Sequence, residues 1–410
     1  MREVWKYLKV CALAVVCVVL LGVSVTAQAA PAQVQGLKQT NNSASSVTVS
    51  WDVLVADGIR YKVELSADKS FSSVKTEETT GATEYFYGLS AGKKYYVRVI
   101  AYEKSTGILG RYSEILEVVT KPDNAKRNLR QTAASTTSIS LKWDKNAGAN
   151  AYQLEYYKDG ASNVKKVVNL GDVQSYTCNK LSQNSNYVFR LYPVMKSASG
   201  YTAVGYTSDT IYNCPVLPGK VSGFTASFSS PTTKYLELSW DKRNSANGYQ
   251  YEVYSLASKK AKKLLSGKKT YNGTAHSISS NKLVKAPFLK VRIRAYVTLS
   301  TGTKYGAWST WTYTAKQPEI KISNVRGGQK LTWKKISGAD SYTLFVSTKR
   351  ENGYKKVGTV SKNSLVVKKC GKKALKSGKS YYYTIVANKK IGKKTYKGCK
   401  THCYSRPYYN

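Results

Sequence analysis

Side chains that could carry acid–base catalysis or hold a metal are scarce in this 410-residue chain. Its two histidines, His276 and His402, stand far apart in the sequence, so each is expected to be an ordinary strand residue. Glycoside hydrolysis requires two neighbouring carboxylates, but residues 320–410 contain only Asp340 and Glu351. No phosphate-binding loop and no Cys-x-x-Cys metal spacing occurs. The sequence therefore predicts a noncatalytic protein with no metal and no cofactor.

Aromatic side chains could instead bind a carbohydrate, because planar rings stack on the faces of sugar rings. Most of the 34 tyrosines alternate along expected strands and are assigned to cores or sheet surfaces. Trp308 and Trp311 lie where the last strand of a repeat is expected to begin, and they are the candidate glycan-stacking residues. Tyr85-Phe86-Tyr87 is a further cluster that could be exposed. The corresponding alternative function is a carbohydrate-binding accessory protein that assists separate secreted hydrolases.

Positive charge is the strongest chemical signal, with a formal net charge of +42 at pH 7. Residues 31–123 hold 11 basic and 11 acidic side chains, whereas residues 320–410 hold 23 and 2. A segment this basic repels itself, which favours an anionic partner that compensates the charge. The candidate partners are an anionic cell-wall polymer such as teichoic acid, or a host glycan such as mucin. The candidate polyanion-binding residues are Lys368, Lys369, Lys372, Lys373, Lys389, Lys390, Lys393 and Lys394.

These lysines could also have either of two further roles. Lysine on exposed strands blocks edge-to-edge aggregation, so the doublets could protect strand edges without binding anything. Lysines interleaved with tyrosines also resemble a nucleic-acid-binding face. However, arginine, which contacts guanine bidentately, is scarce beside lysine, so no specific nucleic acid is expected.

The elements that must position these residues repeat along the chain. Tryptophans recur about 95 residues apart, and each is followed by a corner motif of leucine, a small turn residue and tyrosine. In the first copy the corner is Leu89, Gly92 and Tyr95. The tyrosine hydroxyl is expected to bond back to the backbone of the corner, as in the tyrosine corner of Greek-key sandwiches. The tryptophans are Trp51, Trp143, Trp240 and Trp333.

Two copies of the corner depart from the pattern. Asn184 replaces the glycine in the second copy, and asparagine tolerates the positive φ that the turn requires. The third copy has Ala286-Pro287 and then Leu289 in place of tyrosine. Without the hydroxyl, this corner is expected to be the least regular.

The tryptophan, the corner, and a closing glycine followed by serine or threonine, as in Gly110 to Ser113, resemble the fibronectin type III domain. The resemblance covers residues 31–410 and implies an all-β fold of four tandem fibronectin type III-like Greek-key β-sandwiches. It is closest to the Lys- and Tyr-rich form that Gram-positive, often gut-dwelling, bacteria export. Proline-bearing junctions separate the expected segments: signal peptide 1–29, repeat 1 at 30–122, repeat 2 at 123–218, repeat 3 at 219–318 and strongly basic repeat 4 at 319–410.

The N-terminus has the pattern of a secretory signal peptide. Basic residues precede an apolar run over residues 10–25, and Ala27-Gln28-Ala29 offers small residues for cleavage. An uncleaved anchor is the alternative, but a run of about 16 is short for a membrane span, which needs roughly 20 apolar residues. The mature chain is therefore expected to have no membrane span and to be secreted or associated with the cell surface.

Five cysteines follow this segment, and an odd number leaves at least one thiol unpaired. Export would permit disulfides. Cys178 can pair with Cys214 in the same repeat, and Cys370 can pair with Cys399 or Cys403. Free, partly buried thiols are the other alternative, and the sequence leaves both open.

These features predict a noncatalytic, exported binding or spacer protein. Its basic C-terminal repeats are expected to be held to an anionic cell envelope or mucus. Its neutral N-terminal repeat is expected to be available for a protein or glycan partner.

Overall fold

The computed structural model of the chain is all-β in the part that it describes. One 3-10 turn, η1 (Asn281–Leu283), is the single helical element there. That part contains no helix with the length and hydropathy of a membrane span. Residues 1–28 of the expected signal peptide, which was predicted over residues 1–29, lie outside the described residues. The structure describes residues 29–206, 208–228, 233–256, 261–270, 273–398 and 403–410.

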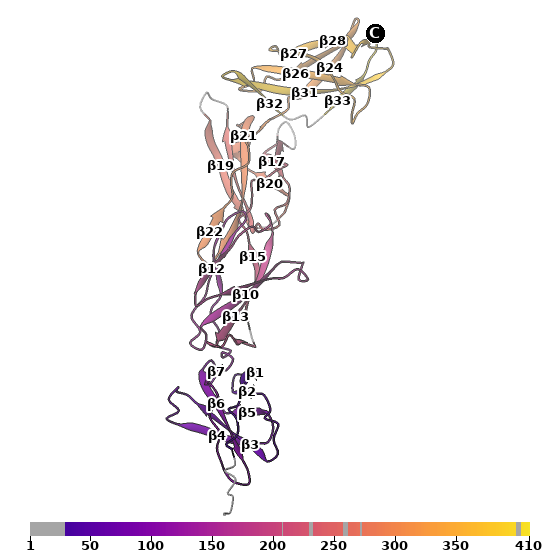
Figure 1. Cartoon of the computed structure of the whole chain (residues 1–410). Helices are drawn as coiled ribbons and strands as arrows, with labels where there is room; N and C mark the ends of the chain where they lie inside the picture. The colour runs from indigo at the N-terminus through magenta and orange to yellow at the C-terminus, as the bar shows by residue number, and fades with distance from the viewer. Residues whose placement is uncertain (1–28, 207, 229–232, 257–260, 271–272, 399–402) are drawn as a thin grey trace, which may run out of the picture. The chain divides into compact units, whose positions relative to one another are not determined.

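Two sheets enclose the first tryptophan (Figure 1). One has the strand order β1-β2-β5 and the other the order β4-β3-β6-β7. Because side chains alternate along a strand, Val47 and Val49 of β2 face inward and pack with Val63 and Val97 of the second sheet. The strands are β1 (Lys38–Asn42), β2 (Ser46–Ser50), β3 (Ile59–Ser66), β4 (Val74–Thr79), β5 (Thr83–Tyr87), β6 (Lys94–Glu103) and β7 (Leu116–Val119).

The same pairing of sheets recurs along the rest of the described chain. The smaller sheets have the orders β12-β9-β8, β16-β17-β20 and β24-β25-β28. The larger ones run β11-β10-β13-β14, β19-β18-β21-β22 and β27-β26-β31-β32, and β15, β23 and β33 pair with their long strands. The strands up to β23 are β8 (Arg130–Ala134), β9 (Ile139–Lys142), β10 (Ala151–Lys158), β11 (Lys166–Leu170), β12 (Ser175–Cys178), β13 (Asn186–Lys196), β14 (Thr202–Val204), β15 (Asp209–Pro215), β16 (Thr225–Phe228), β17 (Tyr235–Ser239), β18 (Gly248–Ser255), β19 (Lys262–Lys269), β20 (Ala275–Ser279), β21 (Phe288–Leu299), β22 (Gly302–Tyr305) and β23 (Thr312–Ala315).

The C-terminal sheets carry the basic part of the chain. A short hairpin of β29 and β30 is added beside them. The strands are β24 (Ile320–Val325), β25 (Gly328–Trp333), β26 (Ser341–Ser347), β27 (Lys355–Val360), β28 (Ser364–Val367), β29 (Lys369–Cys370), β30 (Lys373–Ala374), β31 (Ser380–Ile391), β32 (Lys394–Lys397) and β33 (Tyr404–Pro407).

The described residues fall into two compact units. The first unit comprises the described residues of Met1–Ala125, Asn146–Ala151 and Pro193–Thr207. The second comprises those of Lys126–Lys145, Tyr152–Tyr192 and Ser208–Asn410. The first unit has a core around Trp51, and the second has cores around Trp240 and Trp333.

Each of the repeated tryptophans packs against a tyrosine ring in the core. The rings of Trp51 and Tyr61 meet edge to face with their centroids 5.4 Å apart, an arrangement that the charge distribution of aromatic rings favours. The hydroxyl of Tyr61 in turn accepts a hydrogen bond from the backbone N–H of Leu54 at 2.9 Å. The corresponding pairs are Trp143–Tyr152, Trp240–Tyr249 and Trp333–Tyr342.

The predicted tyrosine corner is present in three copies. The hydroxyls of the corner tyrosines accept hydrogen bonds from backbone N–H groups five residues earlier, at 2.9, 2.7 and 2.9 Å. Asn184 has a φ of +53°, as predicted for the residue that replaces glycine. The tyrosines are Tyr95, Tyr187 and Tyr381, and the donors are Ser90, Ser182 and Lys376.

The third corner departs from this arrangement, as its sequence predicts. Leu289 lies in the tyrosine position and is fully buried. The chain forms η1 before it, and the side chain of Ser280 caps that turn by accepting from the backbone N–H of Lys282 at 3.3 Å. The backbone N–H of Val284, five residues before Leu289, donates to the carbonyl of Asn281 at 3.2 Å, so a backbone bond of this turn replaces the bond that the hydroxyl accepts elsewhere.

The corner hydrogen bond gives a first testable prediction. Tyr381→Phe removes the hydroxyl and keeps the buried ring, so the free energy of unfolding is expected to fall by about 1 kcal/mol. The measurement is unfolding by guanidinium followed by tryptophan fluorescence. Tyr409→Phe is the control, because Tyr409 is 61% exposed; an equal loss in both variants would contradict the assigned role.

Candidate polyanion-binding surface

A hollow of about 730 Å³ opens among the start of β27, the β29–β30 hairpin and the corner before β31. Five lysines line it, and its lining includes no carboxylate. Gly371 turns the hairpin with a φ of +63°, and a Cβ there would lie 2.7 Å from Cδ of Lys355. A larger residue at Gly371 would therefore displace one of the cations. The lining lysines are Lys355, Lys372, Lys373, Lys376 and Lys379.

The predicted lysines separate into two groups in the structure. Lys372 and Lys373 line the hollow, and Lys368 and Lys369 are exposed beside it, before and within β29. The other four predicted lysines lie instead on the β31–β32 hairpin, where Ile391 pairs with Lys394. Sequence reasoning did not single out Lys355, Lys376 and Lys379 of the hollow. The signal that could have found two of them is the corner glycine Gly378, which Lys376 and Lys379 flank.

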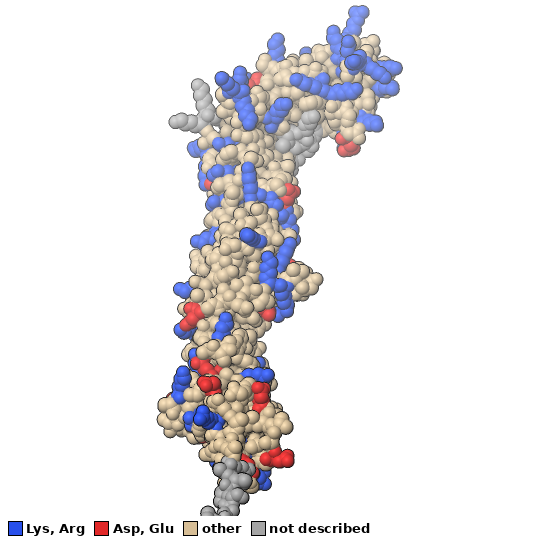
Figure 2. All heavy atoms as spheres, in the orientation of Figure 1, with Lys and Arg blue, Asp and Glu red and all other residues tan. Residues whose placement is uncertain are grey.

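Little negative charge offsets these lysines. Over the described residues after 319, the ion pair present is Arg350–Glu351 at 3.6 Å, and both side chains are highly exposed. The carboxylate of Asp340 accepts from the backbone N–H of Lys390. Figure 2 shows Lys and Arg crowded over the part of the molecule that carries β24 to β33, with few carboxylates. This surface can attract a polyanion over the range of the Debye length, about 10 Å at 0.1 M salt.

The first unit differs in its charge, because several of its acidic residues form ion pairs with basic ones. Glu64 lies 2.6 Å from Arg98, and Glu117 lies 2.9 Å from Lys94. The outer face of the β1-β2-β5 sheet is instead nearly uncharged. On it, Tyr85 and Tyr87 are 52% and 64% exposed, with nearly parallel rings 6.4 Å apart.

Trp308 and Trp311 are packed against cations of the neighbouring strand β21. Arg292 lies 4.2 Å from the ring centroid of Trp308 and 4.6 Å from that of Trp311. Arg294 adds a contact to Trp308 at 4.4 Å, and Lys290 adds one to Trp311 at 4.4 Å. These three basic residues alternate along one strand, so they interleave with the two indoles. A sugar ring would have to displace one of these cations, which argues against glycan stacking here.

This packing predicts a structural role for Trp308. Trp308→Ala is expected to lower the thermal unfolding midpoint, because it removes two cation–π contacts, each worth about 0.5–2 kcal/mol, and the packing of the ring. Binding to a glycan array is expected to stay unchanged when variant and native chain are compared below both midpoints. Loss of glycan binding with no change in unfolding would support the stacking role instead.

The remaining reactive groups are dispersed. His276 on β20 packs against the ring of Tyr251 at 5.6 Å, and burial lowers its pKa; His402 lies outside the described residues. The letters Gly88-Leu89-Ser90-Ala91-Gly92 match the hydrolase pattern Gly-x-Ser-x-Gly. They form the first corner between β5 and β6, where that pattern would need a strand-to-helix turn. Among the described residues no three His, Cys, Asp or Glu side chains are grouped as metal ligands would be.

The sequence left open whether the cysteines form disulfides or are free thiols, and the described cysteines are free in the structure. Cys178 and Cys214 are free and buried, and Cys370 and Cys403 are free and half-buried. Burial raises the pKa of both Cys178 and Cys214 to about 12. Cys370 lines the lysine hollow; Cys399 lies outside the described residues.

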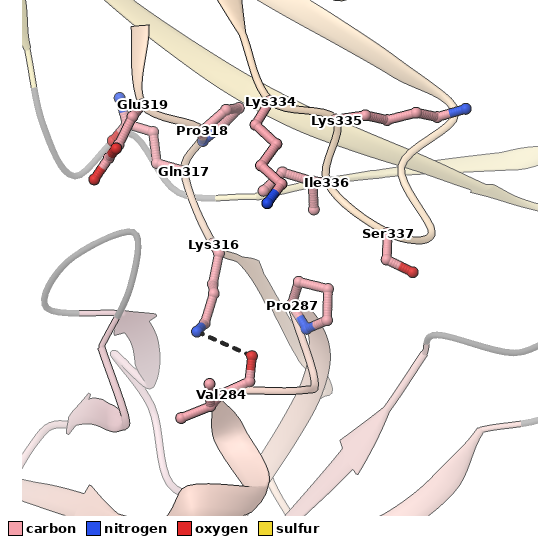
Figure 3. A pocket seen from close by; sticks show the side chains of 10 residues that line it. All are labelled: Val284, Pro287, Lys316, Gln317, Pro318, Glu319, Lys334, Lys335, Ile336 and Ser337. Carbon is pink, nitrogen blue, oxygen red and sulfur yellow. Dashed lines mark hydrogen bonds between the residues drawn. The ribbon is translucent and has the colours of Figure 1, made fainter.

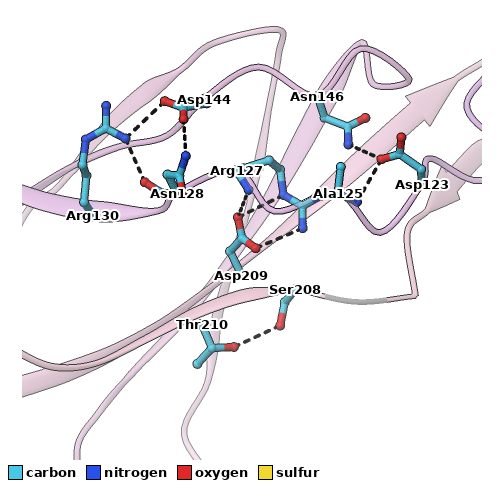
Figure 4. Close-up of polar contacts among 10 residues, drawn as sticks. All are labelled: Asp123, Ala125, Arg127, Asn128, Arg130, Asp144, Asn146, Ser208, Asp209 and Thr210. Carbon is cyan, nitrogen blue, oxygen red and sulfur yellow. Dashed lines mark hydrogen bonds and ion pairs between the residues drawn. The ribbon is translucent and has the colours of Figure 1, made fainter.

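A buried ion pair that sequence reasoning missed lies in the second unit (Figure 4). Arg127, 1% exposed, contacts the carboxylate of Asp209 through Nε at 3.3 Å, and the same carboxylate accepts from its backbone N–H. The pair ties the segment before β8 to the first residue of β15. A buried ion pair contributes little net stability, and Nε and Nη1 of Arg127 have no hydrogen-bond partner among the described residues; the contact therefore serves to fix the position of the two segments.

Comparison with known proteins identifies one part of the chain. Residues 32–119 match the model of the fibronectin type III domain, in agreement with the two sheets formed by β1 to β7. The match assigns these residues, and not the whole chain, to the fibronectin type III domain.

The chain is also similar to a human protein named phosphatidylinositol phosphatase PTPRQ, with 26% identity over 262 residues. These residues are 61% of this chain and 10% of that protein. The PTPRQ of Rattus norvegicus is 27% identical over 164 residues, which are 40% of this chain and 7% of that protein. The chain thus spans a tenth or less of these relatives. Among solved structures it is similar to the chicken CNTN1 FN1–FN3 domains, with 14% identity, a TM-score of 0.28, and coverage of 70% of this chain and 99% of that one.

Proposed function

We propose that the chain is a noncatalytic, exported binding or spacer protein whose basic C-terminal region binds a polyanion. The observation that carries the proposal is the hollow of about 730 Å³ that five lysines line without a carboxylate. An enzyme would need grouped acid–base residues, and His276 instead packs as an ordinary strand side chain. The ligand is an anionic cell-wall polymer or a host glycan, and the neutral first repeat is available for a protein or glycan partner.

The proposal extends the fibronectin type III assignment to four tandem sandwiches, at 30–122, 123–218, 219–318 and 319–410, after a signal peptide at 1–29. The recurring sheet orders and the recurring Trp–Tyr pairs support it. The resemblance to the Lys- and Tyr-rich fibronectin type III repeats that Gram-positive bacteria export supports export, with the protein secreted or held at the cell surface. Isolation of the mature chain and determination of its N-terminal residue test the cleavage after Ala29.

A salt titration tests the polyanion proposal. Binding of the full chain to purified Gram-positive cell walls and to heparin is measured from 50 to 500 mM NaCl. Affinity that falls steeply with salt supports the proposal, and affinity that is indifferent to salt contradicts it.

The alternative, a carbohydrate-binding accessory protein, is favoured by one observation in the first unit. Tyr85 and Tyr87 are exposed and parallel on a nearly uncharged sheet face. Binding that is insensitive to salt in the same titration, and that Tyr85→Ala abolishes, would favour this alternative.

A further inference from the structure

Lys316 is a buried cation that no carboxylate of the described residues neutralises at ion-pair distance. It follows β23 and is 5% exposed. Its ammonium donates to the backbone carbonyl of Val284 at 3.3 Å and lies 5.5 Å from the ring centroid of Phe228. An ammonium group has three donor hydrogens, and a buried charge is costly unless it is paired and hydrogen-bonded. One carbonyl and one ring leave most of that cost unmet.

The side chain of Lys316 lines a hollow of about 350 Å³ in the second unit (Figure 3). The opposite side is formed by the segment Lys334–Ser337, which follows β25. Lys334 directs its ammonium toward the hollow, whereas Lys335 points away from it (Figure 3). Glu319 also lines the hollow and is exposed, so it contributes one carboxylate against three lysines.

Lys316 and Lys334 both line the hollow, and two lysines at one hollow suit a compact oxyanion. Lysine binds phosphate as a point charge, and a tetrahedral phosphate offers several acceptor oxygens to donors that approach from different sides. Desolvation lowers the pKa of Lys316, and a bound anion would restore the preference for the charged form. The hollow falls in the size range of small-molecule sites, about 300–1,000 Å³, so it has room for a phosphate and an organic substituent.

We propose that this hollow binds one phosphate group, either free or carried on a larger molecule, between Lys316 and Lys334. The site is distinct from the lysine hollow that β27, β29 and β30 form, so it goes beyond the proposed polyanion binding. In the lysine hollow, exposed lysines attract a polyanion through their electrostatic field. In the second hollow, the buried Lys316 provides a contact at a fixed position.

Calorimetric titration of the full chain tests the site. The titrants are inorganic phosphate, glycerol phosphate and acetate, each at constant ionic strength. Saturable binding of one phosphate per chain is expected, and Lys316→Met or Lys334→Gln is expected to weaken it about 10- to 100-fold, the loss of one charge-assisted hydrogen bond. Lys330→Gln is the matched control, because this exposed lysine of β25 does not line the hollow; it is expected to change the affinity less than twofold.

The outcomes distinguish the two sources of phosphate and also decide whether the site exists. Tighter binding of glycerol phosphate than of inorganic phosphate assigns the site to a substituted phosphate, and the reverse order assigns it to the free ion. Equal binding of acetate, unchanged affinity in Lys316→Met and Lys334→Gln, or absence of saturable binding overturns the proposal. If Lys316→Met fails to fold, Lys334→Gln decides alone. A Lys372→Gln/Lys373→Gln variant is expected to keep its phosphate affinity, whatever happens to its polyanion binding.

Discussion

The native chain is expected to lose roughly 100- to 500-fold of its affinity for heparin between 50 and 200 mM salt, if each of the five lysines of the hollow contacts one anionic group. Each contact releases a counterion, so the logarithm of the binding constant falls by about 0.7–0.9 per contact for each tenfold rise in salt. Replacing all five lysines by glutamine is expected to make this slope shallower by about four. The measurement is fluorescence anisotropy of labelled heparin at several salt concentrations. The lysines are Lys355, Lys372, Lys373, Lys376 and Lys379.

Two controls make the result specific to the hollow. A second variant carries five exposed lysines of the first unit replaced by glutamine, which changes the net charge equally and is expected to alter the slope by less than one. The free energy of unfolding of the hollow variant is expected to equal or exceed that of the native chain, because the substitutions remove like charges from a self-repelling surface. An equal change of slope in both variants would show that net charge, and not the hollow, governs binding. The control lysines are Lys38, Lys69, Lys75, Lys93 and Lys104.

The features that the sequence predicted well are the local ones. The corner tyrosine lies five residues from the backbone N–H that it accepts from, as Tyr95 and Ser90 demonstrate, so the motif contains both partners. The irregular third corner was equally predictable, because Leu289 cannot supply a hydroxyl. Positive φ at Asn184 follows from the same short pattern.

The features that the sequence did not predict depend on contacts between distant strands. Lys355 faces the hairpin of Lys372 and Lys373 because β27 and the β29–β30 hairpin come together in the fold. The sequence favoured Trp308 as a glycan-stacking residue because it does not show that Arg292, on the distant strand β21, lies over the indole ring. A basic residue at every second position of β21 was the available signal.

Lys316 illustrates a second limit of sequence reasoning. Lysine is exposed at most positions, so the charge count treats all lysines alike. Only the packing of the segment after β23 against Val284 and Phe228 buries this one. Charge composition therefore predicted a basic surface and could not distinguish its exposed lysines from a buried one.

The two buried thiols are expected to react about three orders of magnitude more slowly than an ordinary thiol, because the thiolate is the reactive form. Burial raises the pKa of Cys178 and Cys214 to about 12, roughly three units above an ordinary thiol. At pH 8, Cys178 and Cys214 are therefore expected to react with iodoacetamide about 1,000-fold more slowly than the cysteine of a short unstructured peptide. Peptide mass spectrometry over a time course reads each cysteine separately.

Unfolding in guanidinium provides the control, because it exposes every thiol and returns the pKa values to the ordinary range. All the described cysteines are then expected to react at similar rates without a reductant. Cys178 and Cys214 that stay unreactive after unfolding, and react only once a reductant is added, would establish a disulfide between them. Fast reaction of Cys178 in the native chain would instead contradict its burial on the sheet that β8, β9 and β12 form, because a thiol in that core can meet the reagent only when the sandwich opens.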